Sequence, residues 1–460
     1  MRNSIPAAAL ALVASLALPA AARAQSPYRA AADSLIRAAT ADMSAWLRIA
    51  EIADRFGPRL SGSQALENAI DWAVVQMKAD GLENVHTEPV MVPHWVRGEE
   101  SATLTAPARR ELHLLGLGGS IGTPEGGIEA PVLVVGSFDE LKQRAAEVPG
   151  KIVLFDVPFP SDTDPMETYG RVVQYRTRGA SEAAKLGAVA SLVRSIGPYG
   201  IQTPHAGNMH YQEGVKKIPT AALSLEDALL LHRWQMRGET PVVKLVMRDT
   251  TLADAPSRNV IGEIRGREKP DEVVVVSGHF DSWDVGTGSM DDAGGVVAAW
   301  EAVRLMKELG LRPRRTVRVV LWTNEENGTR GGRAYAQDHE QQLDQHVLAI
   351  ESDNGVFRPL GFRFQGSDAG LAVMKQIAPL LAPIDATYME KGEGEADVSY
   401  MIRDGVPGLA LKVDDSRYFW YHHSEGDTPD KLDPHDVAKC VAAMAVAAYV
   451  AAEMPQPIPR

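Results

Sequence analysis

The sequence has one cysteine, fewer basic residues than acidic ones, and no apolar run of membrane-spanning length beyond its N-terminal segment. Cys440 is the only cysteine among 460 residues, so no intrachain disulfide can form, and we predict a packing role for its thiol. Acidic residues outnumber basic ones by 60 to 47, and the formal net charge is -13. This balance argues against a nucleic-acid partner, which requires clustered lysine and arginine. Beyond the N-terminal segment, the most apolar stretch covers residues 440–452, which is too short to span a bilayer and predicts a packed terminal helix without membrane association.

The first 24 residues have the composition of an export signal. Arg2 supplies a positive start, residues 7–21 are apolar, and Ala22-Arg23-Ala24 fits an A-x-A cleavage site. No cysteine stands directly after this segment, so a bacterial lipoprotein anchor is not expected. We predict that residues 1–24 are a signal peptide and that the protein is exported, periplasmic or secreted, and soluble after cleavage.

The rest of the chain divides into three segments by its pattern. Residues 25–109 contain two helical patterns, at 34–57 and 61–82, and are predicted to be the mainly helical N-terminal part of a catalytic domain. Residues 110–253 contain short apolar strands between Gly/Pro turns, which predict a separate, smaller β-rich domain. In residues 254–460 strands and helices alternate, which indicates the main catalytic domain.

The third segment predicts an α/β fold with a mostly parallel sheet. The strands expected at 272–278 and 316–323 are rich in valine and do not alternate between apolar and polar residues. Such runs are typical of strands that helices cover on both faces. In sheets of this kind, ligands bind beyond the carboxyl ends of the strands.

Acids and histidines follow four of the expected strands. The carboxyl ends of parallel strands lie at one edge of a sheet, so we expect these side chains to meet there. Each motif alone has a structural explanation, such as a helix cap for Asp292, a loop position for Asp284 and a bystander role for His422. Their joint occurrence at successive strand ends favours one site. The candidate residues are His279, Asp281, Asp291, Glu325, Glu326, Asp353 and His423.

This set of residues has the composition of a centre with two zinc ions. Zinc binds imidazole nitrogen and carboxylate oxygen, and a catalytic site keeps one position for water. We assign His279 and Asp353 to one zinc ion, Glu326 and His423 to the other, and Asp291 as the bridge between them. The mixed nitrogen and oxygen donors favour zinc, although cobalt or manganese could substitute.

The neighbouring acids have separate predicted roles. Adjacent side chains in extended backbone point in opposite directions, so Glu325 and Glu326 should not bind the same metal. We take Glu326 as the ligand and Glu325 as the general base that deprotonates the attacking water and protonates the leaving amine. Asp281 is expected to orient the imidazole of His279 without binding metal.

Four motifs resemble the zinc exopeptidase family that contains bacterial aminopeptidases, glutamate carboxypeptidases and the transferrin receptor, and most of all its carboxypeptidase Q branch. They are GHFDSWDVGTGSMDDAGG at 278–295, TNEENG at 323–328, ESDNG at 351–355 and YHHSEGDT at 421–428. The resemblance implies the same five ligands and the same base, Glu325. Because the family's last ligand is followed by Ser or Thr, it selects His423 over His422. It also implies that residues 110–253 are an inserted protease-associated domain.

Two departures from the family pattern concern the group that stabilises the reaction intermediate. Several relatives have a tyrosine immediately before the last ligand, where this chain has His422, with Tyr421 one residue earlier. Many also have a Ser-Asp-His stretch, of which this chain keeps only Asp397. The candidates for oxyanion stabilisation or substrate contact are therefore His422, Tyr421 and Asp397.

The resemblance and the residues together predict an exported exopeptidase with two zinc ions that hydrolyses dipeptides or short peptides with free ends by metal-activated water. The alternatives are an aminopeptidase acting on longer peptides, a glutaminyl cyclase with a single zinc ion, and a non-catalytic binding protein on the same fold. The expected partner is a peptide substrate. Because relatives with the inserted domain are often dimers, a homodimer is also compatible with the resemblance.

Overall fold

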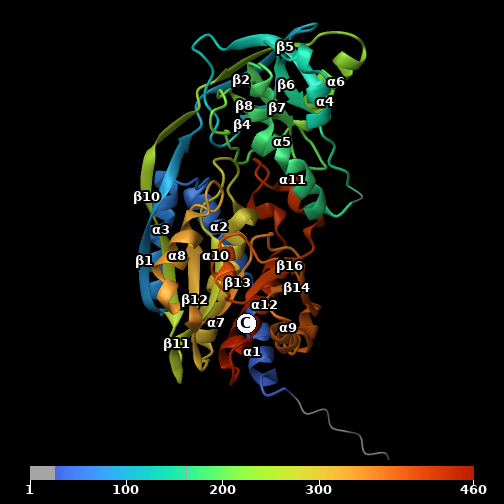
Figure 1. Cartoon of the computed structure of the whole chain (residues 1–460). Helices are drawn as coiled ribbons and strands as arrows, with labels where there is room; N and C mark the ends of the chain where they lie inside the picture. The colour runs from blue at the N-terminus through green and yellow to red at the C-terminus, as the bar shows by residue number, and fades with distance from the viewer. Residues whose placement is uncertain (1–25, 162) are drawn as a thin grey trace, which may run out of the picture.

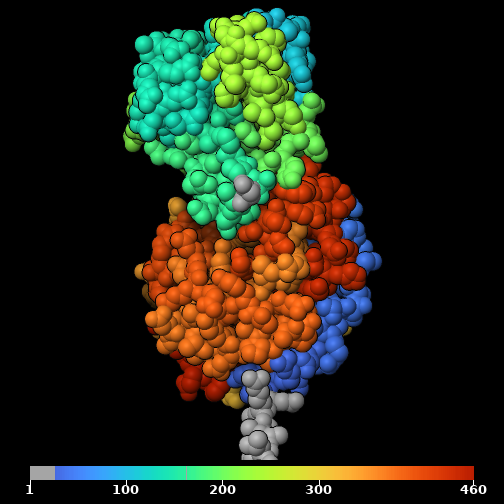
Figure 2. Space-filling view, turned by 90° about the vertical axis from the view of Figure 1, so that its right-hand side faces the viewer, coloured from blue at the N-terminus to red at the C-terminus, as the bar shows by residue number. Residues whose placement is uncertain are grey.

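The chain forms two lobes, each built on an eight-stranded sheet (Figure 1). The computed structural model describes residues 26–161 and 163–460, so the predicted signal peptide lies outside the described residues. The lower lobe contains both ends of the described chain, and the upper lobe stands on it (Figure 2). In spatial order, the strands of the lower sheet are β1 (Glu83–Val96), β10 (Thr250–Ile264), β12 (Arg315–Trp322), β11 (Lys269–His279), β13 (His346–Glu351), β16 (Gly408–Val413), β14 (Pro359–Gln365) and β15 (Tyr388–Lys391).

The centre of the lower sheet is parallel, as the valine-rich runs predict. Strands β12, β11, β13 and β16 run in the same direction, while β1, β10 and β14 pair antiparallel, so the sheet as a whole is mixed. Val274 and Val276 of β11 belong to the core on one face, and Val273 and Val275 to the core on the other. Both faces of β11 are therefore buried, which explains why its apolar residues do not alternate with polar ones.

Helices cover both faces of this sheet. The larger core contains residues of α1 (Arg29–Ala39), α2 (Ser44–Phe56), α3 (Gln64–Ala79), α7 (Gly294–Glu308) and α12 (Pro434–Glu453). The smaller core contains residues of α8 (Arg330–Asp338) and α10 (Ser399–Arg403). Among the described residues, only α12 is long and apolar enough to cross a membrane, but 78% of its most apolar window is buried inside the protein. It is the packed terminal helix that the sequence predicts.

The upper lobe contains the short strands that the sequence predicts, together with more helix than expected. Its central strands β5 to β8 are parallel, and α5 (Pro165–Lys185) and α6 (Leu225–Met236) pack against them. In spatial order the strands are β3 (Arg110–Leu112), β2 (Glu100–Ala106), β9 (Val242–Met247), β5 (Ile128–Val135), β6 (Ile152–Phe155), β7 (Ala190–Arg194), β8 (Thr220–Leu223) and β4 (Leu114–Gly116).

The prediction of a mainly helical segment up to residue 109 is wrong beyond residue 82. Residues 83–106 form β1 and β2, and β1 pairs with β10 along most of its length. The local pattern explains this, because Val90 and Val92 are buried while Met91 between them is exposed, which is the two-residue period of a strand. Together β1 and β10 form a ribbon that leads from the lower to the upper lobe (Figure 1).

The lobes also contact each other beside the carboxyl edge of the lower sheet. The ring of Tyr169 in α5 stacks on Phe419 in α11 (Tyr418–Tyr421), with centroids 4.7 Å apart. The amide of Ala206 donates to the carbonyl of His423 over 2.8 Å. Arg97 forms an ion pair with Asp284 at 2.8 Å, so Asp284, predicted to be a loop acid without a role, holds an arginine between the lobes. These contacts place the upper lobe over the strand ends that carry the candidate residues.

Candidate metal centre

The five predicted ligands lie together at the carboxyl edge of the lower sheet. The Nε2 atom of His279, at the end of β11, lies 3.1 Å from Asp291 Oδ1 and 3.1 Å from Asp353 Oδ1. The Nε2 atom of His423 lies 3.0 Å from Glu326 Oε2 and 3.3 Å from Asp291 Oδ2. Four segments that are separate in the sequence thus deliver donors to one place.

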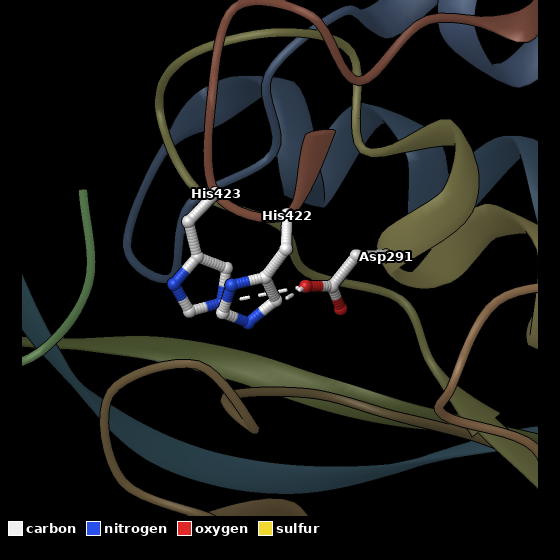
Figure 3. Close-up of side chains that lie close together, drawn as sticks. All are labelled: Asp291, His422 and His423. Atoms are coloured by element: carbon white, nitrogen blue, oxygen red, sulfur yellow. Dashed lines mark ion pairs between the residues drawn. The ribbon is translucent and has the colours of Figure 1, made fainter. Parts of the chain in front are cut away.

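Asp291 lies between the two histidines. One of its carboxylate oxygens faces His279 and the other faces His423. Figure 3 shows its carboxylate directed towards the imidazole rings of His422 and His423, which stack with centroids 3.5 Å apart. A carboxylate with its two oxygens directed to different histidines has the arrangement that a bridge between two metal ions requires.

The chemistry of this cluster fits a metal centre. Asp291 Oδ2, Glu326 Oε1 and His423 Nδ1 are buried without a hydrogen-bond partner among the described residues. Burying carboxylates is costly unless a cation compensates their charge. Three sets of side chains have ligand atoms within 4.8 Å of one another, and together they add Asp292 and His422 to the candidate ligands. Imidazole nitrogen and carboxylate oxygen are the donors that zinc accepts.

The loop that carries Asp291 is held by groups from two other segments. The Asp427 carboxylate accepts the backbone N–H groups of Ser289, Met290 and Asp291 at 3.1, 2.7 and 3.2 Å. The fully buried Arg59 donates to the carbonyls of Phe280, Thr287 and Gly288, whose chain precedes Ser289. Asp291 is therefore held by a hydrogen-bonded frame. Asp427 belongs to the motif at 421–428, but neither Asp427 nor Arg59 was predicted to have a role in the site.

The second aspartate of the pair closes the start of α7. Asp292 Oδ1 accepts the amide of Gly295 over 2.8 Å, which is the capping bond that the sequence suggests. Its Oδ2 accepts the amide of His279 over 3.0 Å. Asp292 thereby ties the end of β11 to the first turn of α7.

Asp281 is close to His279, but the contact differs from the predicted one. The backbone carbonyl of Asp281 lies 3.0 Å from His279 Nδ1, whereas its carboxylate oxygen is 3.9 Å away. The carboxylate instead accepts the amides of Glu325 and Glu326 at 3.0 and 3.3 Å. Asp281 therefore orients the imidazole through its main chain and positions the adjacent glutamates through its side chain.

A cavity of about 250 Å³ opens onto these residues. Glu325 is partly exposed in its wall, and burial, followed by the charges of Asp353 and Glu326, raises the pKa of Glu325 well above its ordinary value. A larger hollow of about 660 Å³ lies at the opposite edge of the sheet, where none of the candidate ligands is found. The lining residues of the smaller cavity are Met166, Tyr169, Arg176, Asp291, Glu325, Glu326, Asp353, Asn354, Glu395, Tyr418, Phe419, His422 and His423.

Of the three residues predicted to contact the reacting group or substrate, only His422 lines this cavity. Burial, with the neighbouring His423, lowers the pKa of His422 well below its ordinary value. Tyr421 accepts a hydrogen bond from Arg417 at its hydroxyl over 3.0 Å, and Asp397 is fully buried with its Oδ1 accepting the amide of Gly332. Neither is among the lining side chains.

Several lining residues were missed from the sequence. Arg176 and Tyr169 belong to α5 of the upper lobe, and their contact with the site depends on how the lobes pack. Tyr418 and Glu395 lie three and two residues before the candidates Tyr421 and Asp397, but neither has a spacing typical of metal ligands. Two histidines in the loop before β8 differ in their position. His205 forms an isolated β-bridge with Ser424, next to the predicted ligand His423, whereas His210 is exposed.

Comparison with known proteins identifies the family. Residues 259–448 match the model of peptidase family M28. The chain is 48% identical over 414 residues to carboxypeptidase Q of Mus musculus and to that of Homo sapiens, covering 90% of this chain and 86% of each relative. The protein belongs to peptidase family M28. It is a zinc metallopeptidase, and the predicted resemblance to carboxypeptidase Q is confirmed.

Solved structures agree with this assignment. The chain superimposes on a peptidase M28 precursor from Shewanella amazonensis with a TM-score of 0.90 and 35% identity, covering 94% of this chain and 99% of that one. A zinc aminopeptidase from Bacillus subtilis matches with a TM-score of 0.66 and 18% identity, covering 90% and 95%. The first comparison supports the family and the second the mixed α/β fold alone.

Proposed function

We propose that this M28 peptidase is an exported exopeptidase that binds two zinc ions and hydrolyses dipeptides or short peptides with free ends. The observation that carries the proposal is the position of Asp291, whose two carboxylate oxygens face the two histidines at distances of 3.1 and 3.3 Å. In this proposal His279 and Asp353 hold one ion, and Glu326 and His423 hold the other. The cavity of about 250 Å³ suits a small substrate.

The chain's own groups would move the proton and hold the substrate. Zinc, when bound, lowers the pKa of water and polarises a carbonyl group. Glu325 lines the cavity beside the ligands and would accept the proton of the attacking water and donate it to the leaving amine. Asp281 fixes Glu325 by accepting its backbone amide. His422, kept neutral by burial, would offer an N–H to the oxygen that gains negative charge.

Three further features belong to this proposal. Residues 110–253 would act as an inserted protease-associated domain that completes the substrate cavity, since Met166, Tyr169 and Arg176 belong to its wall. The signal-like residues 1–24 favour export. The protein would act on peptides either as a monomer or as a homodimer, and the proposed chemistry needs only residues of one chain.

Hydrolysis of matched dipeptides tests this proposal. The purified, zinc-loaded protein is incubated with a panel of dipeptides, each in a free, an N-acetylated and a C-amidated form, and the released amino acids are quantified. We expect cleavage of the free dipeptides and none after the zinc is removed by a chelator. A chain with bound zinc that cleaves no member of the panel, but cyclises an N-terminal glutamine substrate, would contradict the proposal.

A further inference from the structure

One acid in the wall of the cavity has no role in the proposed metal centre. The lining acids are Asp291, Glu325, Glu326, Asp353 and Glu395. The first four are the proposed ligands and the proposed base, whereas Glu395 lies in the loop between β15 and α10. Its side chain is only 11% exposed. A carboxylate that has lost most of its water needs hydrogen-bond donors or a cation, so the partners of Glu395 show what it can still bind.

The protein uses only one of the two carboxylate oxygens of Glu395. Oε1 accepts hydrogen bonds from Asn354 Nδ2 over 2.7 Å and from Arg363 Nη2 over 2.8 Å. No donor from residues 26–161 or 163–460 reaches Oε2, and this oxygen is not among the fully buried atoms that lack a partner. Oε2 is therefore accessible and keeps its full capacity as an acceptor for a group that enters the cavity.

The loop that carries Glu395 is fixed against β14. The amide of Gly394 donates to Gln365 Oε1 over 2.7 Å. A Cβ atom at Gly392 would lie 2.8 Å from the Cβ of Arg363, so the backbone of the loop passes directly over the arginine that pairs with Glu395. Backbone and side-chain contacts together hold the carboxylate in place. A group that is already held in its binding position loses little conformational entropy when a ligand arrives.

Glu395 lies beside one of the proposed zinc ligands. Asn354, which donates to Glu395, directly follows Asp353 in the chain, and all three side chains line the cavity. In a peptide, the α-amino nitrogen is two bonds, about 2.5 Å, from the carbonyl carbon of its own residue. A peptide whose first carbonyl group lies at the metal centre therefore places its ammonium group among the side chains next to the ligands. Glu395 is the lining acid there that has no other proposed role.

We infer that Glu395 binds the free α-ammonium group of the peptide substrate through Oε2 and thereby selects peptides with an unblocked N-terminus. This inference rests on the proposed peptidase function and assigns a residue to the recognition of one terminus. An ammonium group has only donors and an ionised carboxylate has only acceptors, so the two form charge-assisted hydrogen bonds. Oε1 stays with Asn354 and Arg363 in this assignment. Loss of the charge should affect peptides with a free amino group more than analogues without one.

The test compares each dipeptide with its des-amino analogue, in which a hydrogen atom replaces the α-ammonium group. In the wild-type enzyme we expect kcat/KM for the dipeptide to exceed that for the analogue by about 10- to 100-fold, the range of a charge-assisted hydrogen bond. Glu395→Gln keeps an oxygen for Asn354 and Arg363 but removes the charge, so this ratio should fall by at least about fivefold. Glu395→Asp keeps the charge on a shorter side chain and should retain part of the preference.

The design separates substrate binding from support of the cavity wall. The ratio of the two rates is unaffected by a misfolded or zinc-depleted fraction, since such a fraction lowers both rates equally. Glu393→Gln, at an exposed position two residues earlier in the same loop, is the matched control and should leave the ratio at the wild-type value. An unchanged ratio in Glu395→Gln, whether both rates fall equally or neither falls, would overturn the inference.

A binding measurement distinguishes failure of the inference from failure of the proposed function. Titration calorimetry of zinc-loaded Glu325→Gln with the same dipeptide and des-amino analogue reports recognition without turnover. Tighter binding of the dipeptide that is lost on adding Glu395→Gln supports the inference, even if the wild-type protein hydrolyses neither compound and the proposed function fails. Equal binding of the two compounds, or a preference that survives Glu395→Gln, would overturn the inference, even if hydrolysis proceeds.

Discussion

At the scale of single residues, the two adjacent glutamates after β12 have different surroundings. Both glutamates line the cavity, but Glu326 Oε2 lies 3.0 Å from His423, whereas Glu325 forms no ion pair with a histidine among the described residues. Both backbone amides donate to the Asp281 carboxylate, so one side chain fixes the positions of both. Neighbours held in this way can have separate roles, one as ligand and one as base.

Replacing Glu325 by glutamine should separate catalysis from metal binding. Glu325→Gln keeps the size of the side chain but cannot accept the proton, so we expect kcat to fall by about 10²- to 10⁴-fold with the zinc content unchanged. Steady-state kinetics and metal analysis of the same preparation check this. Glu326→Gln is the companion variant and should lose zinc. A Glu325→Gln enzyme with wild-type kcat and full zinc would exclude Glu325 as the base.

A pair of buried acids between the lobes predicts a dependence of stability on pH. Asp249 directly precedes β10, and its Oδ2 is buried without a hydrogen-bond partner among the described residues. Burial, followed by the charge of Glu100, raises the pKa of Asp249 to about 8 from an ordinary value of 3.8. Because the folded state binds this proton more tightly, the stabilisation is complete below pH 3.8 and is lost as the pH rises through about 8.

The variant Asp249→Asn should remove this loss at high pH. We expect the melting temperature of the wild-type protein to fall more between pH 6 and pH 9 than that of the variant, as measured by thermal unfolding in matched buffers. Asp271→Asn, at an exposed position, serves as the control and should behave as wild type. Parallel curves for wild type and Asp249→Asn would show that the proton on this pair does not contribute to stability.

At the scale of elements, the loop between β11 and α7 carries Asp291, the proposed bridging residue, and we expect the hydrogen-bonded frame of this loop to contribute to metal binding. Asp427→Ala removes the acceptor of three backbone amides at residues 289–291. Groups that orient metal ligands contribute about 10- to 100-fold to metal affinity, so we expect a loss of this size. Competition with a chelator of known affinity measures it. Asp430→Ala, which lies on the surface nearby, should not change the affinity.

The sequence predicts some of these elements and not others for physical reasons. The run of valines identifies β11, because a strand buried on both faces needs apolar side chains throughout, and the ligands follow because parallel strands end at one edge. The strand β1 was missed because polar residues at 83–89 hide its short alternation. The role of Asp281 was only partly predicted, because spacing does not reveal whether a carbonyl or a carboxylate makes a contact.

At the scale of the whole molecule, the site is completed where the lobes meet. Arg176 lies 115 positions before Asp291 and in a separate lobe, and no local pattern links the two. Their proximity depends on the ribbon of β1 and β10 and on the stacking of Tyr169 on Phe419. Contacts of this kind depend on how the lobes pack, and the periodicity of the sequence does not predict them.

Export gives a prediction for the whole chain. When the full-length gene product is expressed in a bacterium with a Sec pathway, we expect intact-mass analysis of the exported protein to give an N-terminus after Ala24, because the A-x-A motif ends there. Ala22→Arg together with Ala24→Arg should block cleavage. Full-length protein that remains in the cytoplasm would contradict the proposed export.

The central claim is that five side chains bind two zinc ions and that Asp291 is the ligand shared by both. The metal stoichiometry tests this claim most directly. Metal analysis of the purified mature protein, combined with native mass spectrometry, should find about two zinc ions per chain, as five ligands with one bridge require. Asp291→Ala should lower the zinc content, since both ions share this residue. A stoichiometry of one zinc ion in active protein, unchanged by Asp291→Ala, would contradict the account.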